Sequence, residues 1–163
     1  LDVISGMDST NMEILVKNTT KTLASCVHRV YRDCYGNVKK RQCVRFEVSK
    51  LVLNCKKETL VEIMKHEYAH FMSTTIYQDN CGHDSRFKEM CRKIGASFDE
   101  PSVNTTDIEE QSRKMAKYHV ICDECGHIYT YNRMCQTLKD VKEGRKTVRC
   151  GCGSHSLTFK QNR

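Results

Sequence analysis

The sequence predicts an α+β fold in two parts: a small domain built around a β-hairpin and a long helix, then a cysteine-rich ribbon. Two runs rich in β-forming residues flank a turn at Gly36, which predicts the hairpin. A segment with helical periodicity carries the sequence His66-Glu67-Tyr68-Ala69-His70. Near the end of the chain, closely spaced cysteines and glycines replace the helical pattern, and these predict the ribbon.

The N-terminal segment is expected to form one helix and then the hairpin. The helix is predicted over about 9–20 from its apolar spacing. Its inward-facing residues are expected to be Met12, Leu15 and Val16. The strands are predicted at Thr22–Arg32 and Arg41–Ser49, because the intervening Gly36 and Asn37 tolerate the positive φ of a tight turn. Leu51–Leu53 is interpreted as a short extension or crossover.

The helix that carries the two histidines is predicted to begin near Thr59. Thr59 and Glu62 have the S/T-x-x-E spacing of a capping box, in which each side chain satisfies a free amide of the first turn. Apolar residues then recur with helical periodicity to about Thr75. The paired histidines therefore lie in the middle of a helix, not in a loop.

A loop over Ile76–His83 is predicted to lead into a second helix. That helix begins near Asp84 or Ser85 and ends at Gly95, a residue suited to the left-handed position after a helix. Residues 96–116 are polar and indicate a linker or a loose polar helix.

The change from polar to cysteine-rich sequence places a domain boundary near 112–117. We therefore predict a first domain at 8–112 and a zinc ribbon at 117–160. Pro101 and Asn104 support a linker before this boundary, because both residues favour turns.

The H-E-x-x-H pattern indicates a zinc site of the peptidase type. His66 and His70 are four residues apart, so both imidazoles lie on one helix face and can bind one ion. Glu67 faces the open side of the metal, where it can take a proton from a zinc-activated water. The competing interpretation is a chance helix pair with Glu67 bound to Lys65 or another base.

A catalytic zinc needs a third protein ligand. Ser73 and Ile76 stand where the metzincin pattern requires Gly and His, so that class is excluded. Two candidates remain from spacing: Glu89 on the next helix and His83 just before it. Cys81 is a further candidate ligand in a resting state, against its interpretation as a free thiol.

The segment HEYAHFMSTTIYQDNCGHDSRFKEMCRKIG resembles the SprT-like metallopeptidases, including the Spartan group that degrades proteins crosslinked to DNA. Those proteins share H-E-x-x-H, a variable loop and G-H-x-x-x-F at the start of a helix. The resemblance implies zinc ligands at His66, His70 and His83, with Glu67 as general base, and so favours His83 over Glu89. It extends over about 20–160, because the hairpin and the ribbon also follow the family order, and is most specific at 62–90.

The function implied is a zinc-dependent endopeptidase, associated with DNA and acting on DNA-bound or DNA-crosslinked protein. One alternative is a non-enzymatic zinc-ribbon protein that binds nucleic acid and keeps a vestigial metal site. Another is a zinc hydrolase acting on a non-peptide bond. For the peptidase, we expect the strand at Arg45–Ser49 to bind extended substrate along a sheet edge.

The C-terminal cysteines predict a second, structural zinc. Cys122 and Cys125 form a C-x-x-C-G knuckle, and Cys150 with Cys152 supplies a second pair. The strands of this ribbon are predicted at Val120–Ile121 and Ile128–Tyr131. The second pair is C-x-C where SprT-like ribbons have C-x-x-C, which leaves the fourth ligand open: Cys152 is favoured, and His155 and Cys135 are the alternatives. The cysteines interpreted as structural thiols are Cys26, Cys34, Cys43, Cys55 and Cys91.

Most of the net charge of +7 is concentrated near the end of the chain. Residues 117–163 hold nine Lys or Arg against four Asp or Glu, a net +5. This favours a polyanionic partner, and DNA that is single-stranded or damaged is the one we expect. The predicted DNA contacts are Arg133, Arg145, Lys146 and Arg149. Bases could stack on the tyrosines Tyr118, Tyr129 and Tyr131, although core packing explains these equally well.

Composition also predicts the compartment and excludes a membrane partner. Eleven cysteines, an odd number, with no signal sequence, indicate reduced thiols rather than a disulfide framework. No apolar run approaches the length of a membrane span. We expect an intracellular protein, nuclear if eukaryotic and cytoplasmic if bacterial or viral, with DNA and protein substrates as partners.

Overall fold

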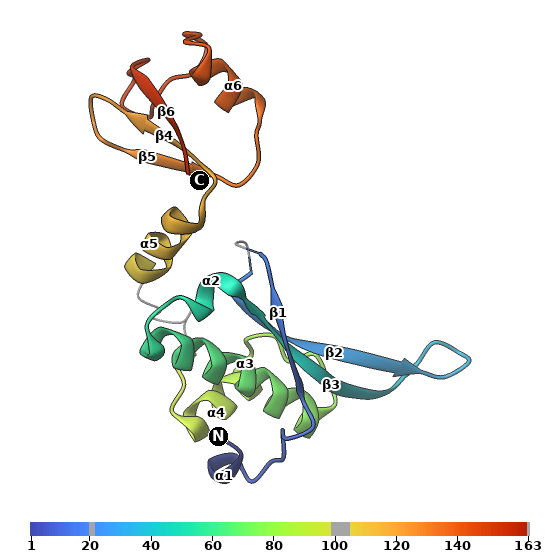
Figure 1. The fold of residues 1–163 in the computed structure, drawn as a ribbon. Helices are drawn as coiled ribbons and strands as arrows, with labels where there is room; N and C mark the ends of the chain where they lie inside the picture. Colours follow the sequence, from blue (N-terminus) through green and yellow to red (C-terminus); the bar gives the residue numbers. More distant parts are fainter. Residues whose placement is uncertain (20–21, 99–104, 163) are drawn as a thin grey trace. The chain divides into compact units, whose positions relative to one another are not determined.

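The computed structural model describes residues 1–19, 22–98 and 105–162. The chain divides into two compact units, Leu1–Gln111 and Ser112–Arg163, and Figure 1 shows the elements of each. Each unit is a mixed α+β structure with its own three-stranded sheet. In the described residues no helix is both long and apolar enough to cross a membrane.

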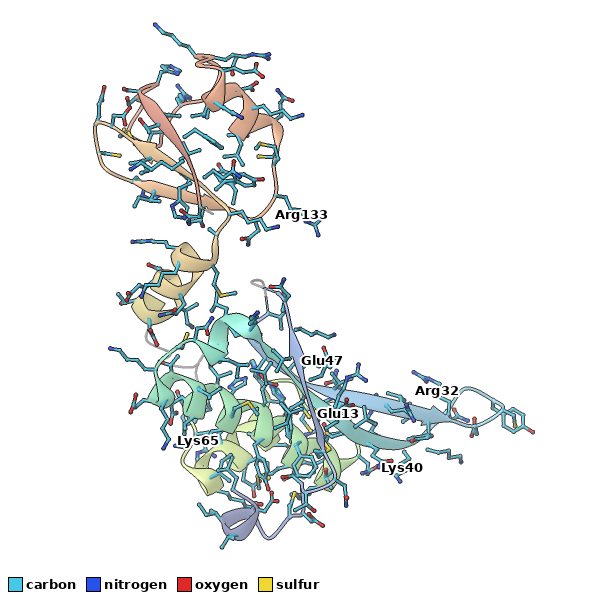
Figure 2. The ribbon with its side chains drawn as sticks, in the orientation of Figure 1. Glu13, Arg32, Lys40, Glu47, Lys65 and Arg133 are labelled. Atoms are coloured by element: carbon cyan, nitrogen blue, oxygen red, sulfur yellow. The ribbon has the colours of Figure 1, made fainter. Side chains whose placement is uncertain are left out.

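The first unit contains the predicted hairpin. Strands β2 (Ala24–Arg32) and β3 (Val38–Ser49) pair antiparallel. The turn between them is held by Asp33, whose carboxylate accepts hydrogen bonds from the amides of Tyr35 and Asn37 at 3.0 and 2.9 Å. The hairpin projects beyond the rest of its sheet, as Figures 1 and 2 show.

The third strand of this sheet lies where a helix was predicted. Strand β1 (Glu13–Lys17) pairs in parallel with β3, so the helix over 9–20 is wrong. Its apolar side chains lack an inward face, since Ile14 and Val16 are 62% and 50% exposed. These β-branched residues suit an extended strand, and pairing with β3 satisfies the backbone. A four-residue helix, α1 (Asp2–Ser5), precedes the strand.

The strand order β1-β3-β2 makes β3 the central strand. Residues Arg45–Ser49 pair with β1 on one side, and Arg45–Val48 pair with β2 on the other. The expectation that Arg45–Ser49 offers a free edge for substrate is therefore wrong. The edge strands of the sheet are β1 and β2.

A β-bulge interrupts the pairing of β2 with β3. Val27 lies opposite Arg45 and His28 opposite Cys43, so Val44 is the extra residue on β3. A bulge changes which side chains share a face of the sheet. Cys43 and Phe46 are consequently both buried, although they are three positions apart.

Helix α3 (Lys57–Tyr77) carries the two histidines and is longer at both ends than predicted. The predicted capping box is not formed. Thr59 instead donates to the carboxylate of Asp107 at 3.1 Å, and the same carboxylate accepts from the Lys56 amide at 2.8 Å. Glu62 pairs with Lys65 at 2.8 Å. A distant carboxylate thus supplies the cap that Glu62 was expected to supply.

Two shorter helices flank α3. Helix α2 (Lys50–Leu53) replaces the predicted extension of the strand, and the Ser49 hydroxyl caps it by accepting from the Leu51 amide. Helix α4 (Ser85–Ile94) has the predicted ends. Asp84 accepts from two amides of its first turn, and Gly95 closes it in the left-handed region with φ 64°.

The core of the first unit lies between the sheet, α3 and α4. Its main cluster of buried residues comprises Cys43, Phe46, Tyr68, Ala69, Phe71, Met72, Phe87, Met90, Cys91, Ile94 and Ala96. Three residues of the N-terminal segment were predicted to face inward, and of these Met12 packs against this cluster. Because α3 and α4 share this core, the ends of both helices are held in one rigid arrangement.

The polar segment before the second unit is helical where the structure describes it. Helix α5 spans Thr105–Met115, in agreement with the loose polar helix considered for 96–116. Pro101 and Asn104, on which the linker interpretation rested, lie outside the described residues.

The second unit forms an antiparallel sheet of order β5-β4-β6. Strands β4 (Tyr118–Cys122) and β5 (Ile128–Tyr131) cover the two predicted ones. Strand β6 (Leu157–Gln161) and helix α6 (Gln136–Lys142) were not predicted. The buried cluster is small and comprises Val120, Leu138 and Val141.

Candidate metal centres

Three imidazoles converge in the first unit, and we call them the histidine triad: His66, His70 and His83. His66 and His70 lie one turn apart on α3, and His83 precedes α4. The Nε2 atom of His83 lies 3.1 Å from Nε2 of His66 and 3.2 Å from Nε2 of His70. The three side chains can therefore offer their nitrogens to one ion.

The ring of Phe87 packs against all three imidazoles of the triad. Its ring is fully buried and stacks on the His70 ring with centroids 4.3 Å apart. The rings of His83 and His66 lie at 4.8 and 5.0 Å from it. Sequence reasoning gave this residue no role, although Phe87 is the last position of the G-H-x-x-x-F pattern. Its spacing from His83 places it one turn into α4, under the three imidazoles.

The triad fits zinc by its donor chemistry and spacing. Burial lowers the pKa of His66, and burial with the neighbouring histidines lowers the pKa of His70 to about 3. Both imidazoles are thus neutral at pH 7, which is the form that binds a metal. Tetrahedral bonds of zinc to nitrogen place two such donors about 3.3 Å apart, close to the observed separations.

The competing ligands lie elsewhere. Glu89 is exposed, and its carboxylate accepts from the Tyr77 hydroxyl at 3.1 Å and pairs with Lys93 at 3.3 Å. Cys81 is buried, with its thiol directed at the carbonyls of Ser73 and Asp79 at 4.0 and 3.9 Å. Neither joins the group of possible ligands that the triad forms.

Glu67 directly follows His66 on α3 and is buried, 9% exposed. Its Oε2 accepts a hydrogen bond from the Cys26 amide on β2 at 2.8 Å. Burial raises the pKa of the Glu67 carboxyl to about 7, against the lowering effect of that hydrogen bond. A carboxyl with a pKa near neutrality can both accept and return a proton.

Four thiols converge in the second unit, and we call them the thiol tetrad: Cys122, Cys125, Cys150 and Cys152. The Sγ atoms of Cys122 and Cys152 are 3.6 Å apart, and those of Cys125 and Cys150 are 3.5 Å apart. All four donors lie within 4.8 Å of one another. Thiolates in this number and spacing fit a tetrahedral structural zinc.

The proposed substitutes for Cys152 are engaged elsewhere. The Nδ1 of His155 lies 2.9 Å from the Val148 carbonyl, and Cys135 packs against the apolar cluster. The C-x-C pair reaches the tetrad because Gly153 adopts φ 94° and donates to the Cys150 carbonyl at 2.9 Å. The tight turn after Cys152 thus lets both thiols of the shorter C-x-C pair join the tetrad.

The sequence model of the SprT-like family matches residues 8–107 of the chain. The chain belongs to the SprT-like family. This family is characterised by a zinc metallopeptidase-like domain, and the histidine triad lies inside the matched region. The thiol tetrad lies beyond it. Searches of curated proteins and of solved structures gave no significant match.

A third group of possible ligands was missed by sequence reasoning. Cys26, His28 and Cys43 offer ligand atoms within 4.8 Å of one another, and we call them the hairpin cluster. Cys26 and Cys43 were interpreted as structural thiols, and the structure instead places both in a group of possible ligands. The available signal was Cys-x-His on one strand of the hairpin with a cysteine on the other. Its pairing depends on the bulge at Val44, which periodicity does not reveal.

The four basic residues predicted to contact DNA are exposed, and one of them forms ion pairs within the unit. Arg133, Lys146 and Arg149 are exposed, and Figure 2 labels Arg133. Arg145 pairs with Asp140 at 3.3 Å and with Glu143 at 2.5 Å. The tyrosines predicted either to stack on bases or to pack in the core lie half-buried against the apolar cluster: Tyr118, Tyr129 and Tyr131. The core explanation therefore accounts for all three.

The raised pKa of Glu67 predicts a pH-dependent stability difference in the metal-free protein. The carboxyl titrates near 4.5 when unfolded and near 7 when folded, so the folded state holds the extra proton between these values. Wild-type stability should fall across this window as pH rises, whereas Glu67→Gln escapes the loss. We expect Glu67→Gln to be more stable by up to about 3 kcal/mol above pH 7, with no such gain below pH 4.5.

This difference is measured by urea unfolding with EDTA present, followed by the helical circular dichroism signal from pH 4.5 to 8. Glu58→Gln serves as control, since Glu58 is exposed on the first turn of the same helix. A gain from Glu67→Gln that stays the same at every pH would contradict the buried-carboxyl account.

Proposed function

We propose that this SprT-like chain is a zinc-dependent endopeptidase in which the histidine triad holds the catalytic ion and Glu67 is the general base. The observation that carries the proposal is the convergence of three imidazoles, in which Nε2 of His83 lies 3.1 and 3.2 Å from those of His66 and His70. The buried Glu67 directly follows His66 on α3. Three protein ligands leave a fourth position for water, as catalytic zinc requires. Family membership supports the same chemistry.

A zinc ion bound by the triad would polarise the scissile carbonyl and acidify the attacking water. Glu67 would accept the proton of the attacking water and then return it to the leaving amine nitrogen. His66 and His70 stay neutral, and α3 fixes the spacing between them. The Phe87 ring packs against both imidazoles and fixes the orientation of their planes. The Cys26 amide stabilises the ionised carboxylate of Glu67 before the proton is taken.

The substrate is proposed to bind in extended form along β2, which is an edge of the sheet. The Cys26 amide on this strand contacts Glu67, so the edge passes directly beside the general base. An extended peptide can add to such an edge through main-chain hydrogen bonds. This favours unstructured polypeptide segments as substrates.

The second unit is proposed to be a zinc ribbon that associates the enzyme with DNA, directing it to DNA-bound or DNA-crosslinked protein. The support is its net charge of +5 and the exposed Arg133, Lys146 and Arg149. Single-stranded or damaged DNA is the proposed form. A second candidate anchor is the projecting hairpin with Lys39, Lys40 and Arg41; Figure 2 shows Lys40 on it.

Glu67→Gln is expected to keep its zinc and to lose proteolysis by ~10²-fold or more, because the ligands are intact and only the proton acceptor is removed. Zinc content by native mass spectrometry and cleavage of an unfolded protein in the presence of DNA are the two measurements. Glu62→Gln, on the same helix, is the control and should cleave normally. Normal turnover by Glu67→Gln would exclude the assigned base. Absence of cleavage by wild type would favour the non-enzymatic DNA-binding alternative.

His83→Ala is expected to lower zinc affinity in the first unit by at least tenfold, while Glu89→Ala leaves it unchanged. The reason is that His83 lies within 3.2 Å of the other two donors, whereas Glu89 contacts Tyr77 and Lys93. Competition with a fluorescent zinc chelator measures the affinity. The opposite ranking of the two variants would assign Glu89 as the third ligand.

Charge reversal at Arg133, Lys146 and Arg149 is expected to weaken binding to all DNA sequences about equally. Each lost phosphate contact should reduce the slope of log affinity against log salt by about 0.7 for single strands. Fluorescence anisotropy at several salt concentrations measures the slope. Lys50→Glu, Lys57→Glu and Lys93→Glu together make the same charge change on the first unit and serve as control. If a chain ending at residue 116 binds DNA as tightly as the whole protein, the hairpin is the anchor instead.

A further inference from the structure

The hairpin cluster occupies a place that the proposed peptidase chemistry does not use. Cys26 and His28 lie two residues apart on β2 and so project from the same face of the strand. Cys43 lies opposite His28 on β3. Because the bulge at Val44 turns Cys43 to the buried face, two thiols and one imidazole meet at the same point between the strands.

The donors are gathered as closely as those of the two centres already described. The Sγ atoms of Cys26 and Cys43 are 3.2 Å apart, and all three ligand atoms lie within 4.8 Å of one another. The corresponding separations are 3.1–3.2 Å in the histidine triad and 3.5–3.6 Å in the thiol tetrad. Cysteines that only fill the core are not expected to lie this close to each other and to a histidine.

We propose that Cys26, His28 and Cys43 form a further metal site, specific for a thiophilic cation such as zinc. Two sulfurs and one imidazole suit zinc, whereas hard cations require oxygen ligands. Zinc–sulfur bonds of about 2.3 Å in a tetrahedron separate two sulfurs by about 3.7 Å, so binding requires an opening of only about half an ångström. Binding displaces the thiol protons and involves no change in oxidation state.

A buried hydroxyl from α3 completes the surroundings. Thr74 is 2% exposed, and its Oγ1 lies 3.0 Å from Nε2 of His28. This contact either fixes the ring while the other nitrogen binds the ion or places an oxygen at the open fourth position. Phe71 lies on the same helix as Thr74, and its carbonyl is 4.0 Å from the Cys43 thiol. The site therefore joins both hairpin strands to α3.

The position suggests what an ion there would do. The Cys26 residue that supplies a thiol also donates its amide to Glu67. An ion bound to Cys26 would hold this segment of the edge strand against α3, and so fix the amide that faces the general base. Cys26, His28 and Cys43 would then act as positioning residues, distinct from the triad that binds the catalytic ion.

The test uses the full-length protein, purified with a reductant and supplied with zinc alone. Native mass spectrometry should find one more zinc in wild type than in the Cys26→Ser/Cys43→Ser variant. The matched control Cys34→Ser/Cys55→Ser should keep the wild-type number, since neither cysteine belongs to a group of ligands. His66→Ala/His70→Ala should lose a different zinc, so failure at the catalytic triad is distinguished from failure here.

A second measurement keeps the proposal testable if the double serine variant does not fold. Wild type is alkylated with iodoacetamide and the labelled sites are found by peptide mapping. Cys26 and Cys43 should be alkylated at least tenfold more slowly when zinc is present than after chelation. Equal labelling rates with and without zinc would overturn the proposal. So would an equal zinc count in wild type and the serine variant.

Discussion

The arrangement of the first unit depends on one constraint, the approach of His83 to two histidines on another helix. His66 and His70 share a helix face by spacing alone, but the third nitrogen must come from a separate element. It arrives because Phe87 is buried against the rings and Asp84 fixes the start of α4. The packing of α4 on α3 therefore sets the positions of the three imidazoles, so the hydrophobic core determines the geometry of the candidate metal centre.

The parts that sequence could predict are those governed by local chemistry. The hairpin turn, the ends of α4 and the two histidines on one helix face all follow from residues within a few positions of each other. The choice of His83 over Glu89 came from the resemblance, since spacing alone left both open. The geometry now gives a separate reason, because Glu89 is engaged by Tyr77 at the surface.

The errors share a cause: in each, a distant partner changed the outcome of a local pattern. The segment at Glu13–Lys17 has apolar spacing that suits a helix, yet the free edge of β3 pairs with it as a strand. Thr59 has capping-box spacing, yet Asp107 accepts its hydrogen bond. The hairpin cluster needed the bulge at Val44, which no window of sequence displays. Long-range pairing therefore decided what propensity left open.

The candidate metal centres of the two units differ in their number of possible ligands, and the two cores differ in size. The first unit has a substantial buried cluster, so packing alone can hold its triad, and three ligands would leave a fourth position open on an ion. The apolar cluster of the second unit comprises Val120, Leu138 and Val141, with Ala116, Cys122 and Cys150 also buried, which is little apolar surface for a chain of this size. Four thiolates closing around one ion would supply the missing stability, and a closed tetrad leaves no position for a substrate. The role proposed for this unit therefore rests on its surface, where Arg133, Lys146 and Arg149 are exposed.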